Sequence, residues 1–445
     1  MKYSEKFKSL YPERFKGIYS SRGDNDLISI RIRQGKERDP SRWWYQQLEV
    51  LANISKKGDG RVHFTTRGDV ELYGIQLSDK EKVLRELESV ELDPRDSCGA
   101  SVRNVLPCPS YICPFAKTDA IKASLEIASF FRHNPEYEFP KLPKRVKISV
   151  SACEKGCSVP VIMDVGIVAR GEDLFDVWVG GGIGDHDFQG IKLFEGVTLA
   201  DAKRISIAVT NILKRENEKR GFKWVVQKYG SERVKEMILN EIEKIQIERI
   251  KGIPSSHLNA KLMVVRTRGG WLNWEEVEEV AKIARENLGF VSLFNSQAIF
   301  IPVRELPKGA ESVEYPYLKN VVEACIGDDY CPPAIISTTK MAEDLLKTAS
   351  DSKMRIHISG CSHSCGRHQV ADLGFRAVMR NGKRALKIYV NGNNYSIGKV
   401  VGEVDYEDYL LVVDKLKGID LENIEEIRRK LMEIPSFKAG GQSEE

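Results

Sequence analysis

The sequence predicts an α+β fold made by internal duplication, with pseudo-two-fold symmetry relating two ferredoxin-like half-units and two α/β modules. First, the chain has 445 residues, too many for one ordinary hydrophobic core and enough for two to four modules. Second, the alternation of strand and helix patterns begins again after Pro254. Third, one constant offset of 208 residues relates Cys153, Cys157, Asp164 and Gly166 to Cys361, Cys365, Asp372 and Gly374. Four coincidences at one offset are improbable by chance, so we infer a duplicated chain.

Residues 1–95 are predicted to contain an N-terminal region and the first half-unit. Residues 1–24 are polar and irregular in pattern. The expected elements are a strand over Leu27–Arg33, a helix over Pro40–Ser55, two strands within Arg61–Ile75 and a helix over Lys80–Glu91. Alternation in the first strand places Arg31 and Arg33 on the same face. The order strand–helix–strand–strand–helix is typical of a ferredoxin-like unit.

Residues 96–252 are predicted to form the first α/β module, which opens with a cysteine-bearing segment. The expected elements are a helix over 117–132, a strand over Arg145–Ser151, two strands within 161–182, and helices over 198–214 and Ser231–Lys251. Gly180–Gly184 resembles a dinucleotide loop but lacks the GxGxxG spacing, the following helix and an acidic ribose partner. We therefore interpret it as a turn at a strand end.

The pattern then repeats in residues 253–315, the second half-unit, and in residues 316–437, the second α/β module. The expected elements are a strand over Leu262–Arg266, a helix over Asn273–Leu288, two strands within 290–303, a helix over Thr338–Ala349 and a strand over Arg355–Ser359. Cys108 corresponds to Cys325 at an offset of 217 residues. Residues 438–445 are expected to be a disordered tail.

Composition narrows the class of protein. Hydrophobic residues make up 42% and charged residues 30% of the chain, and the formal net charge is +4. This balance does not indicate a nucleic-acid partner. The sequence contains no run of about eighteen apolar residues, so it predicts no membrane span. The start of the sequence has no apolar segment typical of a secretory signal, and the nine cysteines lie mostly in close pairs. We therefore expect a cytoplasmic protein whose cysteines are ligands.

Four cysteines of the second half have the spacing of a metal centre. Five residues separate Cys325 from Cys331, and three separate Cys361 from Cys365. Serine and glycine lie in and beside the second pair, so the backbone can turn tightly there. Two close pairs of thiolates on two loops suit an iron–sulfur cluster. A structural zinc site is the alternative, but zinc pairs usually have two to four intervening residues, so that a spacing of five fits less well.

Several motifs together resemble a known family. In order, they are TTR, VRNVLPC, LPKRVKISVSAC, DVGIVA and VWVGGGIG in the first half, and ACIGDDYCPPAI and HISGCSHSCGRHQVADLGF in the second. This order is similar to that of the sirohaem-dependent sulfite and nitrite reductases, and the similarity extends from about Arg31 to Gly398. The resemblance implies that the two α/β modules are the sirohaem and iron–sulfur modules. It also implies an enzyme that reduces a small anion.

The resemblance implies a role for individual residues. Cys325, Cys331, Cys361 and Cys365 would bind a [4Fe–4S] cluster, and Cys365 would also bridge to the sirohaem iron. The residues at positions where the family holds the anion are Arg31, Arg103, Arg145 and Lys147. The residues in strand pairs that meet the sirohaem carboxylates are His63, Arg67 and Asn295. Guanidinium and ammonium groups suit these roles, because they bind anionic oxygens by charge-assisted hydrogen bonds and buried carboxylates need cationic partners.

The implied reaction is the six-electron reduction of sulfite to sulfide, with reduction of nitrite to ammonia as the alternative. The family's sulfite reductases tend to have lysine at the position of Lys147 and its nitrite reductases asparagine, which favours sulfite. The amino-acid sequence from Cys325 to Lys340 is closer to that of nitrite reductases. No flavin or nicotinamide domain is recognisable, so we expect an external electron donor such as ferredoxin.

Further alternatives remain at this point. The first half also contains Cys108, Cys113, Cys153 and Cys157, which form either a second [4Fe–4S] cluster or a relic of duplication with buried thiols. Cys98 lies either near the haem or in the core. A non-catalytic iron–sulfur electron carrier is the competing class of function, but an anion pocket containing Arg31, Arg103 and Lys147 would have no use in it.

Overall fold

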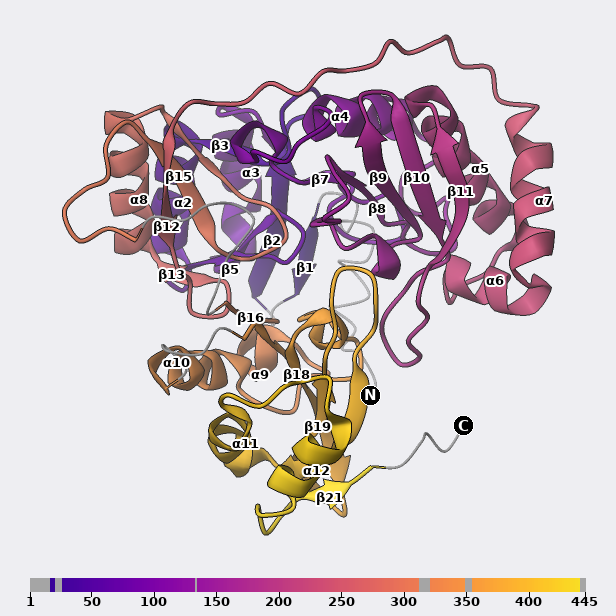
Figure 1. Ribbon diagram of the computed structural model, residues 1–445. Coiled ribbons are helices and arrows are strands. Elements are labelled where there is room, and N and C mark those ends of the chain that lie inside the picture. Colours follow the sequence, from indigo (N-terminus) through magenta and orange to yellow (C-terminus); the bar gives the residue numbers. More distant parts are fainter. Residues whose placement is uncertain (1–16, 21–25, 133, 312–320, 349–353, 441–445) are drawn as a thin grey trace.

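The computed structural model describes residues 17–20, 26–132, 134–311, 321–348 and 354–440, and Figure 1 shows their arrangement. The two ferredoxin-like half-units lie together, the first α/β module lies beside them, and the second α/β module lies below both. The fold is therefore of the α+β class that the sequence predicts, with each half-unit followed along the chain by an α/β module.

Each ferredoxin-like half-unit contributes a short strand to the sheet of the other. The first half-unit contains β1 (Ile18–Ser20), β2 (Leu27–Gln34), β3 (Arg42–Trp44), α2 (Tyr45–Lys57), β4 (Arg61–Phe64), β5 (Val70–Gln76), α3 (Lys80–Glu88) and β6 (Leu92–Asp93). The second contains β12 (Lys261–Val265), β13 (Trp271–Asn273), α8 (Trp274–Glu286), β14 (Phe290–Ser292) and β15 (Ile299–Val303). Strand β13 pairs with β4, and β3 pairs with β14, both antiparallel. The two half-units are consequently interlocked by their backbones.

The exchange of strands obeys the internal symmetry of the chain. An offset of 229 residues separates the first residues of β3 and β13, of α2 and α8, and of β4 and β14. Helices α2 and α8 lie side by side in Figure 1 and share one hydrophobic core, which includes the fully buried Trp43. Helix α8 begins with a capping box, in which Asn273 Oδ1 accepts from the Glu276 amide at 2.8 Å and Glu276 Oε2 accepts from the Asn273 amide at 2.8 Å.

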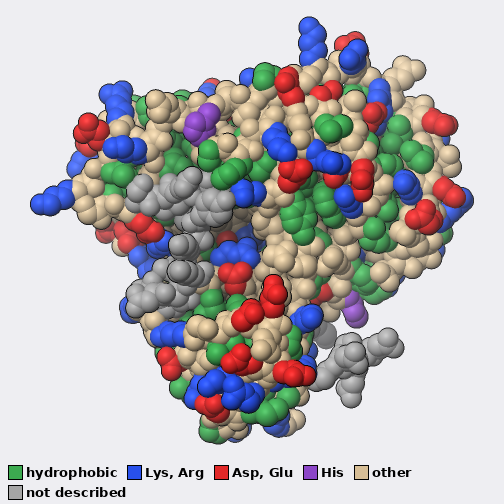
Figure 2. Space-filling model, viewed as in Figure 1, with side chains coloured by type: hydrophobic (Ala, Val, Ile, Leu, Met, Phe, Trp, Pro, Cys, Tyr) green, Lys and Arg blue, Asp and Glu red, His purple; other side chains and the backbone are tan. Residues whose placement is uncertain are grey.

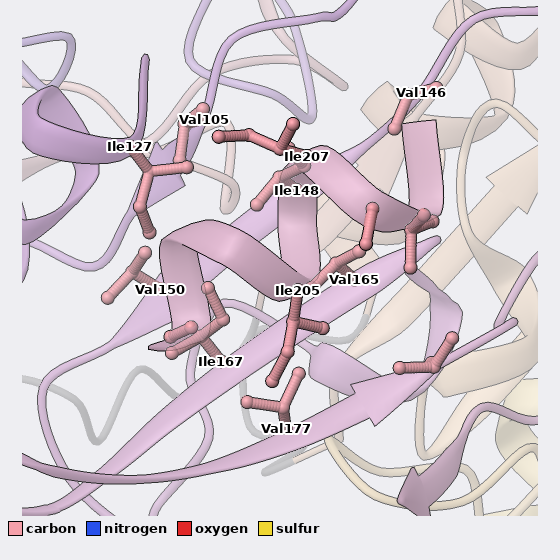
Figure 3. Close-up of a cluster of buried hydrophobic side chains, with 14 of the residues drawn as sticks. Val105, Ile127, Val146, Ile148, Val150, Val165, Ile167, Val177, Ile205 and Ile207 are labelled. Carbon is pink, nitrogen blue, oxygen red and sulfur yellow. The ribbon is translucent and has the colours of Figure 1, made fainter. Parts of the chain in front are cut away.

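The first α/β module is a five-stranded mixed sheet covered by helices. Its elements are β7 (Leu106–Pro107), α4 (Ala120–Phe131), β8 (Ile148–Ser151), β9 (Val165–Gly171), β10 (Leu174–Val179), β11 (Ile191–Val197), α5 (Leu199–Glu216), α6 (Phe222–Tyr229) and α7 (Ser231–Ile242). The strand order is β11-β10-β9-β8-β7, in which β7, β8 and β9 are parallel and the rest antiparallel. Side chains from the strands and from α4 and α5 meet in one apolar core (Figure 3).

The second α/β module repeats this topology. Its elements are β16 (Val322–Ala324), α9 (Gly327–Tyr330), α10 (Thr338–Thr348), β17 (Ile356–Ser359), β18 (Leu373–Arg380), β19 (Lys383–Val390), β20 (Lys399–Asp405), α11 (Tyr409–Leu416), α12 (Ile424–Leu431) and β21 (Lys438–Ala439). Strands β16, β17 and β18 are parallel, and β18 to β21 are antiparallel. In each module three strands are parallel, and a cysteine loop follows the middle one, β8 or β17. The two cysteine loops therefore lie at equivalent positions.

Three expectations are corrected by the structure. The helix expected from Pro40 begins only at Tyr45, because Arg42–Trp44 is paired with β14. The helix expected over Ser231–Lys251 ends at Ile242, and the chain then crosses the top of the molecule to β12 without regular structure (Figure 1). The tail expected to be disordered from Lys438 begins with a strand, since Lys438 and Ala439 pair with β20. Residues 441–445 lie outside the described residues.

The surface mixes charges of both signs. Lys and Arg side chains are interspersed with Asp and Glu over the face shown in Figure 2. Among the described residues, the structure contains no helix that is both long and apolar enough to span a membrane.

Candidate functional site

One large cavity lies between the first α/β module and the cysteine loop of the second. Its volume is about 540 Å³. Five cationic side chains line it: Lys144, Arg145, Lys147, Arg220 and Lys223. The glycine-rich turn after β10 forms one wall, and His363, between two cysteines of the second module, forms part of another. A cavity of this size and charge suits a large ligand with several negative groups.

The parallel strands position Lys147 at the edge of this cavity. Lys147 lies immediately before β8, and its amide donates to Asp164 Oδ2 at 2.8 Å, just before the neighbouring β9. In the described part of the chain, the Lys147 ammonium forms no ion pair. Burial, and then the charges of Arg145 and Arg67, lower the pKa of Lys147 to about 7. An ammonium of this kind can release a proton near neutral pH.

Three further arginines, Arg67, Arg103 and Arg31, extend the positively charged region beyond the wall of the cavity. Arg67 Nη2 donates to the Asn104 carbonyl at 2.9 Å, while its buried Nε has no hydrogen-bond partner. Burial lowers the pKa of Arg67 to about 10. Arg103 Nη2 donates to the Gly99 carbonyl at 2.9 Å, and burial, together with Arg31 and Arg145, lowers its pKa to about 9. Since burial and neighbouring positive charges lower both pKa values, the two arginines belong to a cationic group that favours an anionic ligand.

Arg31 is the member of this group that has its own counter-ion. Its Nη2 lies 2.6 Å from Glu71 Oε1, and its Nε donates to the same oxygen at 2.7 Å. Glu71 also accepts hydrogen bonds from the Tyr19 hydroxyl at 3.0 Å and from the Tyr73 hydroxyl at 2.7 Å. One carboxylate therefore lies at the centre of a buried hydrogen-bond network. Arg31 therefore supplies less net positive charge than Arg103, Arg145 or Lys147.

The cysteine loop of the second module is held in a tight turn. It follows β17, and a Cβ placed on Gly366 would lie 1.9 Å from the Ile358 carbonyl oxygen. Within the loop, Ser364 and Arg367 have positive φ values of 59° and 57°. From the first half-unit, Thr66 Oγ1 donates to the Cys365 carbonyl at 3.2 Å. Only glycine fits at position 366, and the turn brings Cys361 and Cys365 toward the other cysteine pair.

The four second-module thiols influence one another. Burial, and then the nearby Cys365, raise the pKa of Cys325 to about 12. Burial and the other three cysteines raise the pKa of Cys331 as well. Backbone amides point at the sulfurs, including the Gly360 amide, which lies 3.1 Å from Cys325 Sγ. Four such thiols can ionise together only beside a polycationic centre, so the set suits a metal cluster.

The spacing of the thiols bears on the zinc alternative. Across the described ranges, no group of three or more His, Cys, Asp or Glu side chains converges closely enough to be the ligand set of one metal ion. A cluster of several iron and sulfide atoms accepts thiols that stand farther apart.

A second, smaller cavity occupies the equivalent place in the other half. Its volume is about 90 Å³, and Cys157 and Asn295 lie in its wall. Its charged groups are neutralised internally: Arg355 Nη2 pairs with Asp372 Oδ1 at 2.7 Å, and the buried Arg367 pairs with Glu323. The two related cavities therefore differ in volume and in net charge, and only the larger offers uncompensated cations among the described residues.

The sequence-predicted site residues do not all meet at one place. Arg145 and Lys147 line the large cavity, and Arg67 and Arg103 lie close enough to influence their charges. His63 belongs to another network, in which its Nδ1 lies 2.9 Å from Glu71 Oε2. Asn295 lies at the small cavity, where its Nδ2 donates to the Cys157 carbonyl at 2.7 Å. The structure thus separates His63 and Asn295 from the other cofactor candidates.

Sequence reasoning missed several residues of the large cavity: Lys144, Arg220, Lys223, Trp224 and His363. Arg220 and Lys223 flank Gly221 at the start of α6, far from any motif. Lys144 adjoins Arg145, and a run of three cations in four residues was the available signal. His363 was hidden within the cysteine motif.

Comparison with known proteins identifies related chains. Residues 98–246 and 319–405 match the family model "Nitrite and sulphite reductase 4Fe-4S domain", and residues 27–90 match "Nitrite/Sulfite reductase ferredoxin-like half domain". The chain is 26% identical to the ferredoxin–nitrite reductase of Synechococcus elongatus, over 89% of this chain and 85% of that protein. It is 24% identical to sulfite reductase [ferredoxin] 1 of Mycolicibacterium paratuberculosis, over 83% of this chain and 75% of that protein.

A solved structure shares the fold. The NirA protein of Mycobacterium tuberculosis superposes with a TM-score of 0.75, at 18% identity, covering 93% of this chain and 87% of that one. The duplicated arrangement of half-units and modules therefore occurs beyond this chain.

Proposed function

Because this chain belongs to the family of sirohaem-dependent nitrite and sulfite reductases, we propose that it reduces sulfite to sulfide with six electrons from an external donor such as ferredoxin. It is an oxidoreductase that uses sirohaem and a [4Fe–4S] cluster. The observation that carries the choice of sulfite is Lys147, whose ammonium lines the large cavity without an ion-pair partner among the described residues.

The residues present suit both cofactors. Cys325, Cys331, Cys361 and Cys365 would hold the cluster, with backbone amides directed at their sulfurs. The large cavity would hold sirohaem, whose carboxylates need the cations that line it and the unpartnered Nε of Arg67. When bound, the two cofactors supply single electrons to the substrate.

The glycine-rich turn keeps this cavity open. A Cβ on Gly182 would lie 2.9 Å from Lys223 Cδ, and one on Gly181 would lie 2.2 Å from the Val161 carbonyl oxygen. Side chains at these positions would displace the wall or the cation. We infer that the turn provides a smooth surface beside the cofactor.

The protein's part in the reaction is to bind the anion and to supply protons. Arg103 and Arg145 would hold the oxygens of the substrate by charge-assisted hydrogen bonds. Lys147, with a pKa of about 7, would bind the anion as the ammonium and donate a proton as oxygen leaves as water. Asp164, bound to the Lys147 amide, would keep the lysine in place.

The alternative is reduction of nitrite to ammonia by the same residues. The named relatives include ferredoxin–nitrite reductases as well as ferredoxin sulfite reductases. The motif around Cys325 also resembles that of nitrite reductases. Substrate preference must therefore be measured on this chain.

Steady-state kinetics with both anions tests the proposal. The holoenzyme, purified without oxygen and supplied with reduced ferredoxin, is expected to have a kcat/KM for sulfite about tenfold or more above that for nitrite. Lys147→Asn should narrow or reverse this ratio, whereas Lys235→Asn, on exposed helix α7, should leave it unchanged. A wild-type preference for nitrite would contradict the choice of sulfite. Turnover of neither anion would favour an electron carrier.

A further inference from the structure

The first α/β module contains a second set of four cysteines that the proposed function does not use. Cys108, Cys113 and Cys153 are buried, and Cys157 is partly exposed. They lie on two loops, one after β7 and one after β8. We propose that Cys108, Cys113, Cys153 and Cys157 bind a second [4Fe–4S] cluster.

The first argument is the equivalence of the two cysteine loops. The loop after β8 corresponds to the loop after β17, since each strand is the middle of a parallel trio. The Ala152 amide lies 3.1 Å from Cys108 Sγ, just as the Gly360 amide lies 3.1 Å from Cys325 Sγ. Ala152 and Gly360 are separated by the same 208 residues as the cysteine pairs that follow them. The first sulfur of each set is therefore held in the same way.

Other backbone amides are directed at the sulfurs in both halves. The Lys155 amide donates to Cys153, and the His363 amide donates to the equivalent Cys361. The Phe115 amide donates to Cys113, and the Ala334 amide donates to Cys331. Amide–sulfur hydrogen bonds stabilise negative charge on cluster thiolates and tune the reduction potential. A relic with merely apolar thiols would have no need to keep these donors.

The four first-half thiols also lie close to one another. The thiols of Cys113 and Cys153 form a hydrogen bond, and Cys108 lies within electrostatic range of both Cys153 and Cys157. Two pairs from separate loops thus meet at one place. This is the same arrangement as in the second module, which would hold the cluster of the proposed function.

The other half of the chain closes over this site. From the loop between β19 and β20, Tyr395 Oη donates to the Glu154 carbonyl at 2.6 Å, and Asn394 Nδ2 donates to the Lys155 carbonyl at 2.9 Å. The Tyr395 ring also covers Gly156, whose added Cβ would lie 2.6 Å from the ring. From the second half-unit, Asn295 binds the Cys157 carbonyl, as Thr66 binds that of Cys365. A cluster here would be shielded from water.

This second site would hold a cluster without a haem. The cavity beside Cys157 measures about 90 Å³, against about 540 Å³ for the cavity beside the second-module loop. Its wall contains the buried pair of Arg367 and Glu323 where a tetrapyrrole would need space. The cluster would therefore be a separate one-electron centre.

The experiment is to count iron, acid-labile sulfide, zinc and sirohaem per chain in the holoenzyme purified without oxygen. Two clusters and one sirohaem predict about nine irons and eight sulfides, with one sirohaem. About five irons and four sulfides with one sirohaem would overturn the second cluster and leave the proposed function intact. One zinc in addition to about five irons would overturn it in favour of a zinc site. Absence of sirohaem would count against the proposed function instead.

Variants locate the additional iron. Cys157→Ser, together with Cys153→Ser, should remove about four irons and four sulfides while sirohaem stays at one per chain. Cys98→Ser is the matched control, because Cys98 is the one cysteine outside both sets, and its iron and sulfide content should equal that of the wild type. A double variant with unchanged iron and sulfide would overturn the assignment.

Electron paramagnetic resonance of the reduced wild-type protein decides the case if the double variant fails to fold. A second cluster that is not bridged to a haem should give an additional signal of about one spin per chain. Only one cluster signal, that of the centre coupled to sirohaem, would overturn the proposal.

Discussion

Lys147 and Arg355 occupy equivalent positions in the two halves but differ in their partners. Both amides donate to an aspartate Oδ2 at 2.8 Å, to Asp164 and Asp372 respectively. The Arg355 guanidinium also turns back onto Asp372, with Nη2 at 2.7 Å, whereas the Lys147 ammonium remains in the large cavity. Because a paired cation cannot bind an anion as strongly, the difference at this one position makes the large cavity the better site for an anion.

Replacing Arg103 by alanine should remove a substrate contact without removing the haem. We expect Arg103→Ala to lower kcat/KM for sulfite by about 100-fold, because one charge-assisted contact to the reacting anion is lost. The sirohaem absorbance per chain should be retained, since the five cations that line the large cavity remain in place. Arg233→Ala, on exposed helix α7, is the control. Unchanged turnover in Arg103→Ala would remove this residue from substrate binding.

Glu71 should stabilise the fold in a pH-dependent way. Although burial opposes ionisation, Arg31 and His63 lower the pKa of Glu71 well below its usual value. A carboxyl whose pKa is lowered in the folded state adds stability above its unfolded pKa of about 4.3 and loses it as the pH falls below that value. We expect Glu71→Gln to lower the free energy of unfolding at pH 7 by about 3 kcal/mol, since Arg31 loses its counter-ion.

Denaturant unfolding of the wild type and Glu71→Gln between pH 7 and about pH 3 tests this expectation. The difference between them should be constant near neutral pH and should shrink as the pH falls below about 4.3. Glu433→Gln, at an exposed pair with Lys415, should leave stability nearly unchanged at every pH. A difference that grows toward low pH would contradict the assigned direction of the Glu71 pKa.

The cysteine loop after β17 depends on a glycine that has no tolerance for a side chain. A Cβ at position 366 would lie 1.9 Å from the Ile358 carbonyl oxygen, and backbone atoms cannot move aside cheaply. We expect Gly366→Ala to lower the iron and sulfide content by about four each, because Cys365 is displaced. Gly171→Ala, whose Cβ would meet only Leu174 Cβ at 3.5 Å, is the matched control. Full iron content in Gly366→Ala would show that the loop can adapt.

The sequence predicted most elements but not how the half-units exchange strands. Alternation and helical spacing placed β2, β4, β5 and α8 within a few residues, because those patterns depend on one buried face. The predicted helix over Pro40–Ser55 includes the residues of β3, and no strand is predicted over β13. Each has three residues, and each is stabilised by pairing with the other half-unit rather than by its own pattern. Local sequence carries no signal for such a pairing.

The residues of the candidate site that lie in sequence motifs could be predicted, whereas the residues that tertiary packing brings to the cavity could not. The cysteine pairs and Lys147 lie in contiguous motifs, so their positions could be expected from the resemblance. Arg220 and Lys223 reach the cavity only because α6 packs against the glycine-rich turn. His63 was expected at the cofactor because it lies on the same strand pair as Arg67. In the structure its Nδ1 lies 2.9 Å from Oε2 of Glu71, the residue directly opposite it on β5.

Considered together, the two halves have diverged around sites that each half completes for the other. The turn after β10 lies against the cysteine loop of the second module, where Asp185 accepts a hydrogen bond from Ser362. The loop between β19 and β20 covers the cysteine loop of the first module. Figure 1 shows both loops reaching across between the modules. Each site proposed for a cofactor therefore lies at a contact between the halves, and its occupation should affect the stability of the whole molecule.

Removing sirohaem should destabilise the protein, and salt should partly restore it. Without the carboxylates of the cofactor, Lys144, Arg145, Lys147 and Lys223 repel one another across the large cavity, whereas Arg220 is paired with Glu218. A ligand present at about 1,000 times its Kd stabilises the folded state by about 4 kcal/mol, so sirohaem-free protein should have a Tm several degrees lower. Because about 0.1 M salt reduces the range of such repulsion to about 10 Å, added salt should raise the Tm of the sirohaem-free protein more than that of the holoenzyme.

Calorimetry of both forms, with the cluster content matched and the NaCl concentration varied from low to about 0.5 M, measures this difference. Lys144→Gln in the sirohaem-free protein should raise its Tm by relieving the repulsion, and Lys228→Gln, outside the cavity on α6, should not. Equal salt dependence in the two forms would show that the cavity cations are already compensated. In that case the carboxylates of the cofactor would have to be held by other groups, and the assignment of sirohaem to this cavity would lose its electrostatic basis.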